Sequence, residues 1–162
     1  ISAVDLIKGI AMLAGLESID VEGATGTIET NFEGKSAAAI KAFQEGRDFV
    51  YIHFEGPDEC AHQGNLAGKI KCLEYIDSRG LKPIIEYLEN SGDDFRVLIV
   101  PDHRTPMSIR THSSDPVPYV IYDSTLRLEP DADKQFNERS GSKGRFFKSG
   151  VELADHFFQK QQ

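Results

Sequence analysis

The sequence predicts an α/β fold with a largely parallel sheet and helices on both of its faces. Segments with apolar residues at helical spacing alternate with short β-branched and aromatic runs, which is typical of this class. The most apolar run, over residues 95–100, is typical of a strand buried on both faces of a parallel sheet. No repeat or linker divides the 162 residues, so residues 1–162 are predicted to form one domain.

The N-terminal third of the chain predicts two helices and two strands. Apolar residues recur at helical spacing over residues 3–14, where Gly15 follows as a helix stop, and again over residues 36–45. Residues 16–21 are predicted to form a short strand. Residues 49–54 are β-branched and aromatic, and a Gly-Pro pair follows them closely, which predicts a second strand.

A long helical segment is predicted after a polar loop over residues 58–65. Apolar spacing places this helix over residues 66–88. Gly80 and Pro83 indicate irregularities within it, because glycine and proline both weaken a helix interior. Gly92 is expected to end the segment.

The C-terminal part predicts two more strands and one helix. Residues 95–100 are expected to form a central strand, and residues 117–122 form another that carries a proline near its start. A polar loop over residues 105–116 joins them. Residues 129–148 are charged and dotted with glycine and serine, which predicts irregular structure, and a last helix is expected over residues 150–159.

Composition and charge exclude several classes of function. The formal net charge of −8 provides no basic surface for a phosphate backbone, so nucleic acid is not an expected partner. No apolar run approaches the roughly 20 residues that span a bilayer, so no membrane association is expected. Cys60 and Cys72 are interpreted as free thiols of a reducing compartment, which favours a cytoplasmic protein.

Aspartate and histidine residues gather where strands are predicted to end. Asp58 and His62 are four residues apart, so both side chains reach the same side of a helical turn and can bind one divalent ion. Asp102 and His103 follow the strand at residues 95–100, and His112 can fold back from the next loop. Mixed oxygen and nitrogen ligands favour Mn²⁺ or Zn²⁺ over Mg²⁺. The alternatives are an ordinary helix pair and an ordinary strand-end cap.

Three further residues have a structural interpretation beside a functional one. His53 lies within a predicted strand and is expected to pack there, as is His156 in the last helix. Cys60 lies between two candidate ligands, but we interpret it as a bystander.

Three basic residues are candidates for binding a phosphate group. Lys8 stands in the first helix, where a solvated surface lysine is the alternative. Arg104 and Arg110 lie in the loop region between the candidate ligands His103 and His112. A guanidinium there can bind phosphate through two hydrogen bonds, and the alternative is an ion pair with Asp115.

Three motifs carry a resemblance to a known family. They are EGPDECAHQG at residues 55–64, PDHRTP at residues 101–106 and RTHSSDPVP at residues 110–118. In this order, they make the chain resemble the cofactor-independent phosphoglycerate mutases, in the archaeal-type branch of the alkaline phosphatase superfamily. The resemblance covers essentially the whole chain, including ISAVDLIKG at residues 1–9 and GATG at residues 23–26.

The resemblance implies an isomerase of glycolysis and gluconeogenesis that uses two ions. In that family, two Mn²⁺ or Zn²⁺ ions flank a serine, which takes a phosphoryl group from 3-phosphoglycerate and returns it to the 2-hydroxyl group. No 2,3-bisphosphoglycerate is required. By motif, Asp58, His62 and His112 would hold one ion, whereas Asp102 and His103 would hold the other.

The same resemblance implies that the nucleophilic serine lies outside this chain, so no catalytic residue is expected within it. A preceding N-terminal segment would supply that serine, a further aspartate and the domain that grips the glycerate. The chain is therefore expected to be an incomplete, C-terminal part of an alkaline-phosphatase-like domain that is inactive alone. We also expect it to self-associate through the surface that the segment would cover.

Two other functions stay open. Another phosphohydrolase or phosphomutase of the same superfamily would share these metal ligands and differ in the missing specificity domain. A non-catalytic metal-binding domain would instead hold a structural ion in a closed four-coordinate site.

Overall fold

The computed structural model describes residues 1–126 and 135–159, which form two compact units. Unit 1 comprises residues 1–91 and 105–111. Unit 2 comprises residues 92–104 and the described residues from 112 onward. The single domain over the whole chain stays a prediction.

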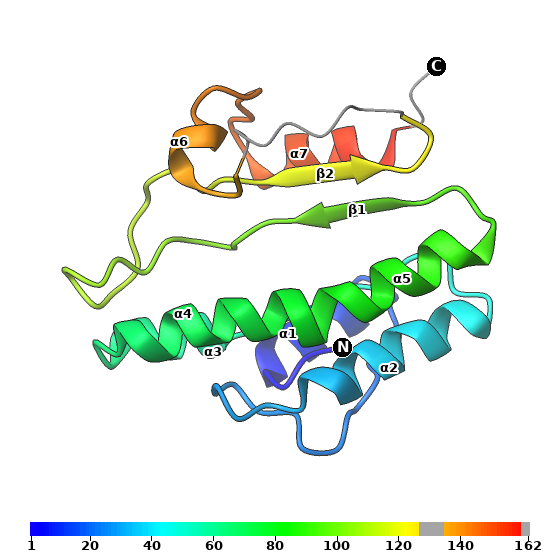
Figure 1. The fold of residues 1–162 in the computed structure, drawn as a ribbon, viewed down its shortest axis with the longest axis horizontal. Coiled ribbons are helices and arrows are strands. Elements are labelled where there is room, and N and C mark those ends of the chain that lie inside the picture. The colour runs from blue at the N-terminus through cyan, green and yellow to red at the C-terminus, as the bar shows by residue number, and fades with distance from the viewer. Residues whose placement is uncertain (127–134, 160–162) are drawn as a thin grey trace. The chain divides into compact units, whose positions relative to one another are not determined.

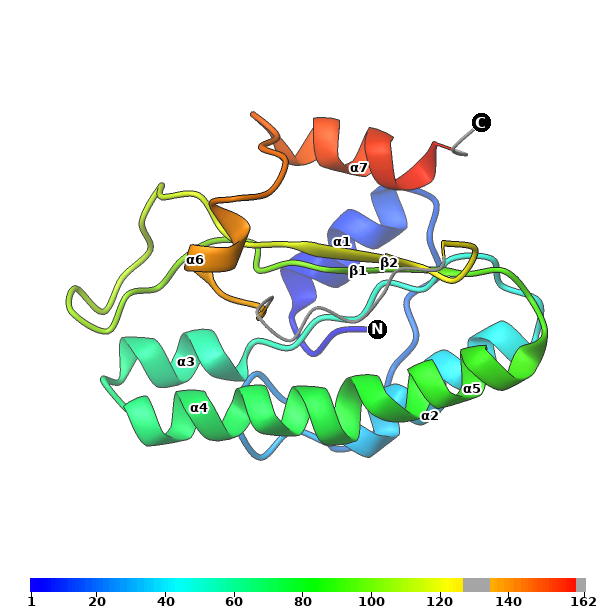
Figure 2. The same cartoon turned by 45° about the horizontal axis from the view of Figure 1, so that its top comes forward.

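Unit 1 is built from helices (Figure 1). They are α1 (Asp5–Leu13), α2 (Phe32–Gln44), α3 (Gly56–His62), α4 (Leu66–Tyr75), the π-helical segment η1 (Ile76–Leu81) and α5 (Lys82–Ser91). Helix α4 continues through η1 into α5, while α3 lies along α4 and α2 lies along α5 (Figures 1 and 2). The helices predicted over residues 3–14 and 66–88 are therefore confirmed, the second with an irregularity at Gly80.

The π-helical segment forms where another helix inserts a hydroxyl group against it. The Ser36 hydroxyl of α2 donates to the carbonyl oxygens of Arg79, at 3.0 Å, and of Gly80. A Cβ at Gly80 would lie 3.0 Å from the ring of Phe54, so glycine is needed for this close approach. A side chain that takes over a helical carbonyl is a usual cause of such a local departure from the α-helix.

An aromatic and cationic cluster forms the core of unit 1. The rings of Phe32 and Phe54 stack at 5.5 Å, and Tyr75 meets Phe32 edge-on at 5.6 Å. The buried Lys35 ammonium lies 4.9 Å from the centre of the Phe54 ring and donates to the His53 carbonyl at 2.9 Å. Burial lowers the pKa of Lys35. These contacts fix the backbone just before α3 begins.

Helix α2 begins earlier than the predicted range of residues 36–45. Asn31 caps it, because its side-chain oxygen accepts from the Gly34 N–H at 2.8 Å and its amide donates to the Glu22 carbonyl at 2.9 Å. The cap extends the helix by one turn beyond its apolar stretch.

The prediction of a loop over residues 58–65 is wrong for residues 58–62, which belong to α3. Pro57 stands in the first turn, where its missing N–H leaves no intrahelical bond unmade. Asp58 and Glu59 lie at the positive end of the helix dipole. Buried Cys60 anchors the short helix to unit 1.

Residues 16–21 and 49–54 do not form the predicted strands. The second segment nevertheless shows parallel pairing at one point. The Ile1 ammonium donates to the Tyr51 carbonyl at 2.9 Å, and the His53 N–H donates to the Ile1 carbonyl at 3.0 Å. Because both bonds involve a single partner residue, no ladder is built.

Unit 2 contains β1 (Arg96–Ile99), β2 (Val120–Asp123), α6 (Glu138–Gly141) and α7 (Gly150–Phe158). The strands pair antiparallel, with Arg96 opposite Asp123 and Ile99 opposite Val120. This is the only sheet among the described residues, so the predicted largely parallel sheet with helices on both faces is not confirmed.

Most of the elements predicted for unit 2 are confirmed with changed limits. Strand β1 lies within residues 95–100 and α7 within residues 150–159. Strand β2 begins three residues later than predicted, after Pro118, which has no N–H to donate to a ladder. Of the irregular stretch at residues 129–148, the part before residue 135 lies outside the described residues, and the rest contains the four-residue α6.

Arg96 joins the elements of unit 2. Its Nε donates to Asp123 at 2.6 Å, and its Nη1 donates to the carbonyls of Phe157 at 3.0 Å and Gln159 at 2.5 Å, at the end of α7. The hydroxyl of Thr125, assisted by Arg96, holds the pKa of Asp123 below its usual range. The carboxylate is therefore charged and pairs fully with the guanidinium.

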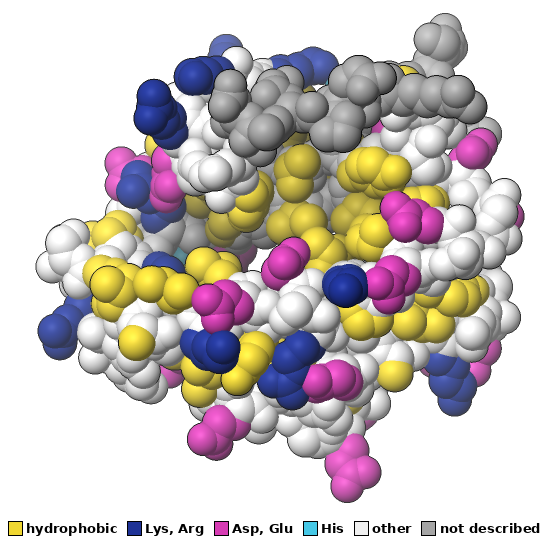
Figure 3. Space-filling model, in the orientation of Figure 1, with side chains coloured by type: hydrophobic (Ala, Val, Ile, Leu, Met, Phe, Trp, Pro, Cys, Tyr) yellow, Lys and Arg dark blue, Asp and Glu magenta, His cyan; other side chains and the backbone are white. Residues whose placement is uncertain are grey.

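Charges of both signs intersperse on the face that carries α4 and α5 (Figure 3). Lys71 pairs with Glu74 at 3.0 Å, and Lys82 pairs with Glu86 at 3.7 Å. Pairs at these spacings lie on the same face of a helix and favour the helical conformation. Among the described helices, none combines the length and apolarity that crossing a lipid bilayer requires.

Replacing Asn31 with alanine should lower the free energy of unfolding by about 1 kcal/mol, because α2 loses its N-terminal cap. Urea denaturation followed by circular dichroism measures this loss. Asn90→Ala is the control, since the Asn90 amide donates to the Glu86 carbonyl within its own helix. An equal loss in both variants would contradict the capping role.

Candidate metal centre

Asp58 and His62 meet on one side of α3, as their spacing predicts. The His62 Nε2 atom lies 3.2 Å from Asp58 Oδ2, and both side chains are partly buried. The other ring nitrogen, Nδ1, lies 2.9 Å from the carbonyl oxygen of Arg110. Because a carbonyl oxygen only accepts, Nδ1 carries the proton, and Nε2 is the nitrogen turned toward the carboxylate.

This arrangement fits a cation chemically. A neutral imidazole that donates through Nδ1 presents a lone pair at Nε2, and a carboxylate oxygen faces that lone pair at 3.2 Å. Two electron-rich atoms at this distance are held together favourably by a proton or a metal ion. A histidine fixed by a backbone carbonyl through its second nitrogen is the usual outer support of a metal ligand.

A buried threonine supports the aspartate from the opposite side. Thr105 is 5% exposed, and its hydroxyl donates to Asp58 Oδ1. Its backbone carbonyl accepts from the Lys69 ammonium of α4 at 2.9 Å. The sequence predicts neither role, because a threonine before a proline indicates only a turn and a lysine in a helix indicates only a solvated surface.

Arg110 has an unfavourable backbone conformation at its position beside His62. Its φ of 53° lies in the left-handed region, and it is the only non-glycine residue among those described with a positive φ. The guanidinium packs on Gly64, where a Cβ would lie 2.6 Å from the Arg110 Cζ atom. Gly64 itself has a φ of 71°, so glycine suits this position twice over.

In unit 2, Asp102 contacts His103, and the ring of His103 lies beside that of His112. The Asp102 carboxylate accepts from the His103 backbone N–H at 3.0 Å, and its other oxygen lies 3.4 Å from the His103 Nε2. An isolated antiparallel bridge between Arg104 and Ser113 brings the two histidines together, with ring centres 3.7 Å apart. The structure thus joins Asp58 to His62 in one unit and the other three candidates in the other unit.

The basic candidates all have acidic or backbone neighbours. Lys8 pairs with Asp20 at 2.7 Å, which raises the pKa of Lys8. Arg104 lies 3.6 Å from Asp115, the pairing that the sequence analysis keeps as its alternative. The binding of phosphate by Lys8, Arg104 and Arg110 stays a prediction.

The two cysteines are free, as expected, and both are buried. Burial, together with the neighbouring Cys60, raises the pKa of the Cys72 thiol to about 12. Cys72 is therefore protonated at neutral pH and is a poor metal ligand there.

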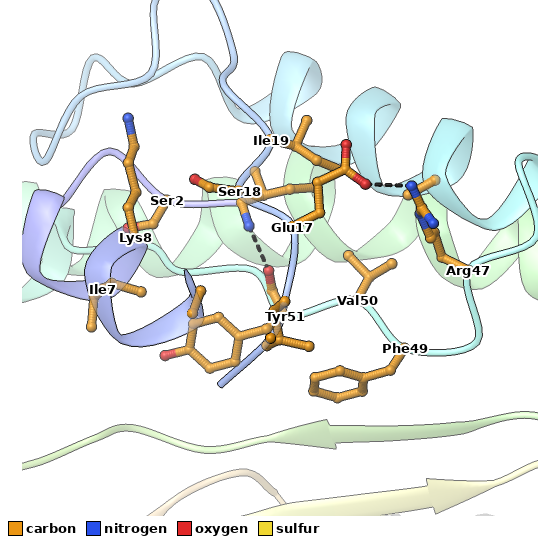
Figure 4. A pocket seen from close by; sticks show the side chains of 15 residues that line it. Ser2, Ile7, Lys8, Glu17, Ser18, Ile19, Arg47, Phe49, Val50 and Tyr51 are labelled. Atoms are coloured by element: carbon orange, nitrogen blue, oxygen red, sulfur yellow. Dashed lines mark hydrogen bonds and ion pairs between the residues drawn. The ribbon is translucent and has the colours of Figure 1, made fainter. Parts of the chain in front are cut away.

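A cavity of about 240 Å³ in unit 1 includes none of the candidate ligands (Figure 4). Its charged residues already have partners, because Arg47 pairs with Glu17 and Lys8 pairs with Asp20. Tyr51 and its neighbours contribute an apolar wall. The cavity has no unpaired charge that would orient a phosphate among the residues that Figure 4 labels.

Comparison with known proteins identifies the class. The model of the Metalloenzyme superfamily matches residues 1–160, so the chain belongs to this superfamily. It is 50% identical over 144 residues to the 2,3-bisphosphoglycerate-independent phosphoglycerate mutase of Methanosarcina mazei, a match that covers 89% of this chain and 36% of that protein. It is 43% identical to a probable mutase of the same name from Geobacter sulfurreducens, with 96% and 38% covered.

A solved structure is also similar. The PH0037 protein from Pyrococcus horikoshii matches with a TM-score of 0.75 at 33% identity, over 89% of this chain and 42% of that one. The chain thus spans little more than a third of the length of these curated relatives.

Replacing Gly64 with alanine should displace Arg110 in addition to straining the backbone. We expect a loss of about 1–2 kcal/mol from the left-handed φ and a shifted Arg110 Nε–Hε signal in a ¹H–¹⁵N spectrum. Gly46→Ala is the matched control, with a φ of 85° and no atom within 4 Å of the added Cβ. It should lose similar stability and leave the Arg110 signal in place.

Proposed function

We propose that this chain is the C-terminal part of a metal-dependent phosphoglycerate mutase, which interconverts 3-phosphoglycerate and 2-phosphoglycerate through a phosphoserine. The observation that carries the proposal is the pair of Asp58 and His62, with the Nδ1 proton of His62 held by the Arg110 carbonyl. The names of the relatives from Methanosarcina mazei and Geobacter sulfurreducens support this substrate. No 2,3-bisphosphoglycerate is needed in this proposal.

In this proposal, Asp58, His62 and His112 hold one divalent ion, and Asp102 and His103 take part in holding a second. Mixed carboxylate and imidazole ligands suit Mn²⁺ or Zn²⁺. The two groups are linked closely along the covalent chain. Thr105, which bonds to Asp58, is two residues from His103, and Arg110, which bonds to His62, is two residues from His112. Two Cα–Cα steps extend at most about 7 Å.

The bound ions would lower the pKa of a nucleophilic hydroxyl and stabilise the charge of the transferring phosphoryl group. The residues of this chain orient and bind. His62 would present Nε2 to an ion, because its Nδ1–H donates to the Arg110 carbonyl. Lys8 would leave its ion pair with Asp20 to bind a phosphate group of the substrate. Arg104 would leave Asp115 for the same purpose. The serine lies in a further segment of the protein, so the chain alone is inactive.

We extend the proposal to the fold and the surroundings of the complete protein. There, residues 49–54 join a largely parallel, alkaline-phosphatase-like sheet, a placement that the parallel bonds to Ile1 support. Leu6 and Leu13 of α1 are 69% and 92% exposed, which supports self-association of the chain through this apolar face. The protein acts in the cytoplasm in this proposal.

Removing both His62 and His112 should abolish binding of one of the two proposed Mn²⁺ or Zn²⁺ ions, because that ion loses both of its imidazole ligands. Isothermal titration calorimetry of the chain with each metal measures binding. His156→Ala is the control, because His156 packs against Phe147 in unit 2 at 5.2 Å. Unchanged binding in the double His62→Ala, His112→Ala variant would contradict the proposed ligand set.

A chimaera tests the mutase activity. In the Methanosarcina mazei mutase, the matching stretch of 144 residues is replaced by that of this chain. The chimaera should convert 3-phosphoglycerate to 2-phosphoglycerate, followed by ³¹P NMR, whereas the chain alone should not. Asp58→Asn in the chimaera should lower the rate by more than about a hundredfold, since the ions stabilise the transition state by several kcal/mol.

Asp77→Asn is the control for this loss, because Asp77 is an exposed aspartate of η1 and is no proposed ligand of a metal or a substrate. It should retain most of the rate. A chimaera that hydrolyses simple phosphate esters and does not isomerise 3-phosphoglycerate would contradict the mutase proposal and favour a phosphohydrolase.

A further inference from the structure

The two oxygens of Asp58 have different surroundings. Oδ1 accepts the hydroxyl proton of Thr105, whereas Oδ2 faces His62 Nε2 at 3.2 Å. A hydroxyl has one proton, and here that proton is committed to Oδ1. The side chain of Asp58 is therefore held with a single oxygen directed toward the histidine.

The threonine is itself held in place. It is 5% exposed, which removes water as a competing partner for its hydroxyl. Its carbonyl accepts from Lys69 at 2.9 Å, so α4 fixes the backbone from which the hydroxyl projects. Helix α4 packs along α3, which carries Asp58. The donor and the acceptor of the Thr105–Asp58 bond thus rest on neighbouring helices of unit 1.

We propose that Thr105 is a positioning residue that makes Asp58 a one-oxygen ligand and thereby selects the metal ion. The inference rests on the proposed metal site. A carboxylate oxygen that accepts from a hydroxyl has fewer lone pairs to offer, which favours binding of an ion through the other oxygen. This suits the four to six ligands of Zn²⁺ or Mn²⁺, whereas Ca²⁺ accepts two oxygens from one carboxylate to complete a shell of six to eight.

Lys69 assists Thr105 in this role. The Lys69 ammonium donates to the backbone carbonyl of Thr105. It therefore affects Asp58 indirectly, through the Thr105 hydroxyl. Removing the ammonium leaves the hydroxyl in place but loosens its anchor. The effect of Lys69 on metal binding should therefore be smaller than that of Thr105.

Thr105→Val removes the hydroxyl and keeps the shape of the side chain. We expect the affinity for Mn²⁺ to fall about 10–100-fold, as is usual when the outer support of a ligand is lost. The affinity for Ca²⁺ should fall less, because the released Oδ1 can join Oδ2 on the larger ion. The measured quantity is the ratio of Mn²⁺ to Ca²⁺ dissociation constants, from calorimetric titrations of the chain.

Two variants separate this role from general loss of structure. Thr105→Ser restores the hydroxyl and should restore the metal ratio. Thr125→Val is the matched control, because the Thr125 hydroxyl donates to Asp123, an aspartate of unit 2 that is no proposed ligand. It should leave the ratio unchanged. Should Thr105→Val fail to fold, Lys69→Met is titrated instead, with a several-fold loss for Mn²⁺ expected and recovery in Lys69→Arg.

The outcomes distinguish this inference from the function on which it rests. Binding of Mn²⁺ by the unaltered chain together with an unchanged ratio in Thr105→Val overturns the role of Thr105 and leaves the metal site standing. An equal loss for both metals also overturns the selection. A chain that binds neither Mn²⁺ nor Zn²⁺ overturns the proposed metal site, and the role of Thr105 with it.

Discussion

The hydrogen bond from His62 to the Arg110 carbonyl is the contact on which the candidate centre depends. It fixes the proton on Nδ1 and directs Nε2 to Asp58, 3.2 Å away. The same segment of chain, residues 105–111, meets the aspartate at its other end through Thr105. Both ends of this segment therefore rest on α3, and the residues that precede and follow it are the remaining candidate ligands. The docking of this loop on one short helix therefore positions Asp58 and His62.

That docking has a conformational cost which the surrounding structure offsets. Arg110 occupies the left-handed region at a cost of about 1 kcal/mol or more. In return its carbonyl reaches the imidazole and its guanidinium packs on Gly64. Helix α3 is too short to be stable by itself. The stacking of Phe32 on Phe54 fixes the chain just before α3, and packing along α4 fixes α3 itself.

Local pattern predicts part of this arrangement and misses the part that depends on distant residues. Spacing alone predicts that Asp58 and His62 share a helical face, and apolar periodicity predicts the rod of α4 and α5. The polar composition of α3 does not predict a helix. The helix is stabilised by burial of Cys60 and by packing against α4. The sequence around Thr105 does not indicate its role. The role depends on Asp58, which is 47 residues away in the sequence and is brought close only by folding.

The strand prediction for residues 49–54 fails for a related reason. A helix satisfies its own backbone, whereas a parallel strand needs partners from elsewhere in the chain. The two bonds to Ile1 have the parallel pattern and stop after one residue. The candidate metal ligands lie in local motifs of the sequence. The basic residues that would bind a substrate are instead paired with Asp20 and Asp115 within the chain. The chain belongs to the Metalloenzyme superfamily, and the candidate ligands for a metal ion are the part of the proposed site that its local motifs supply.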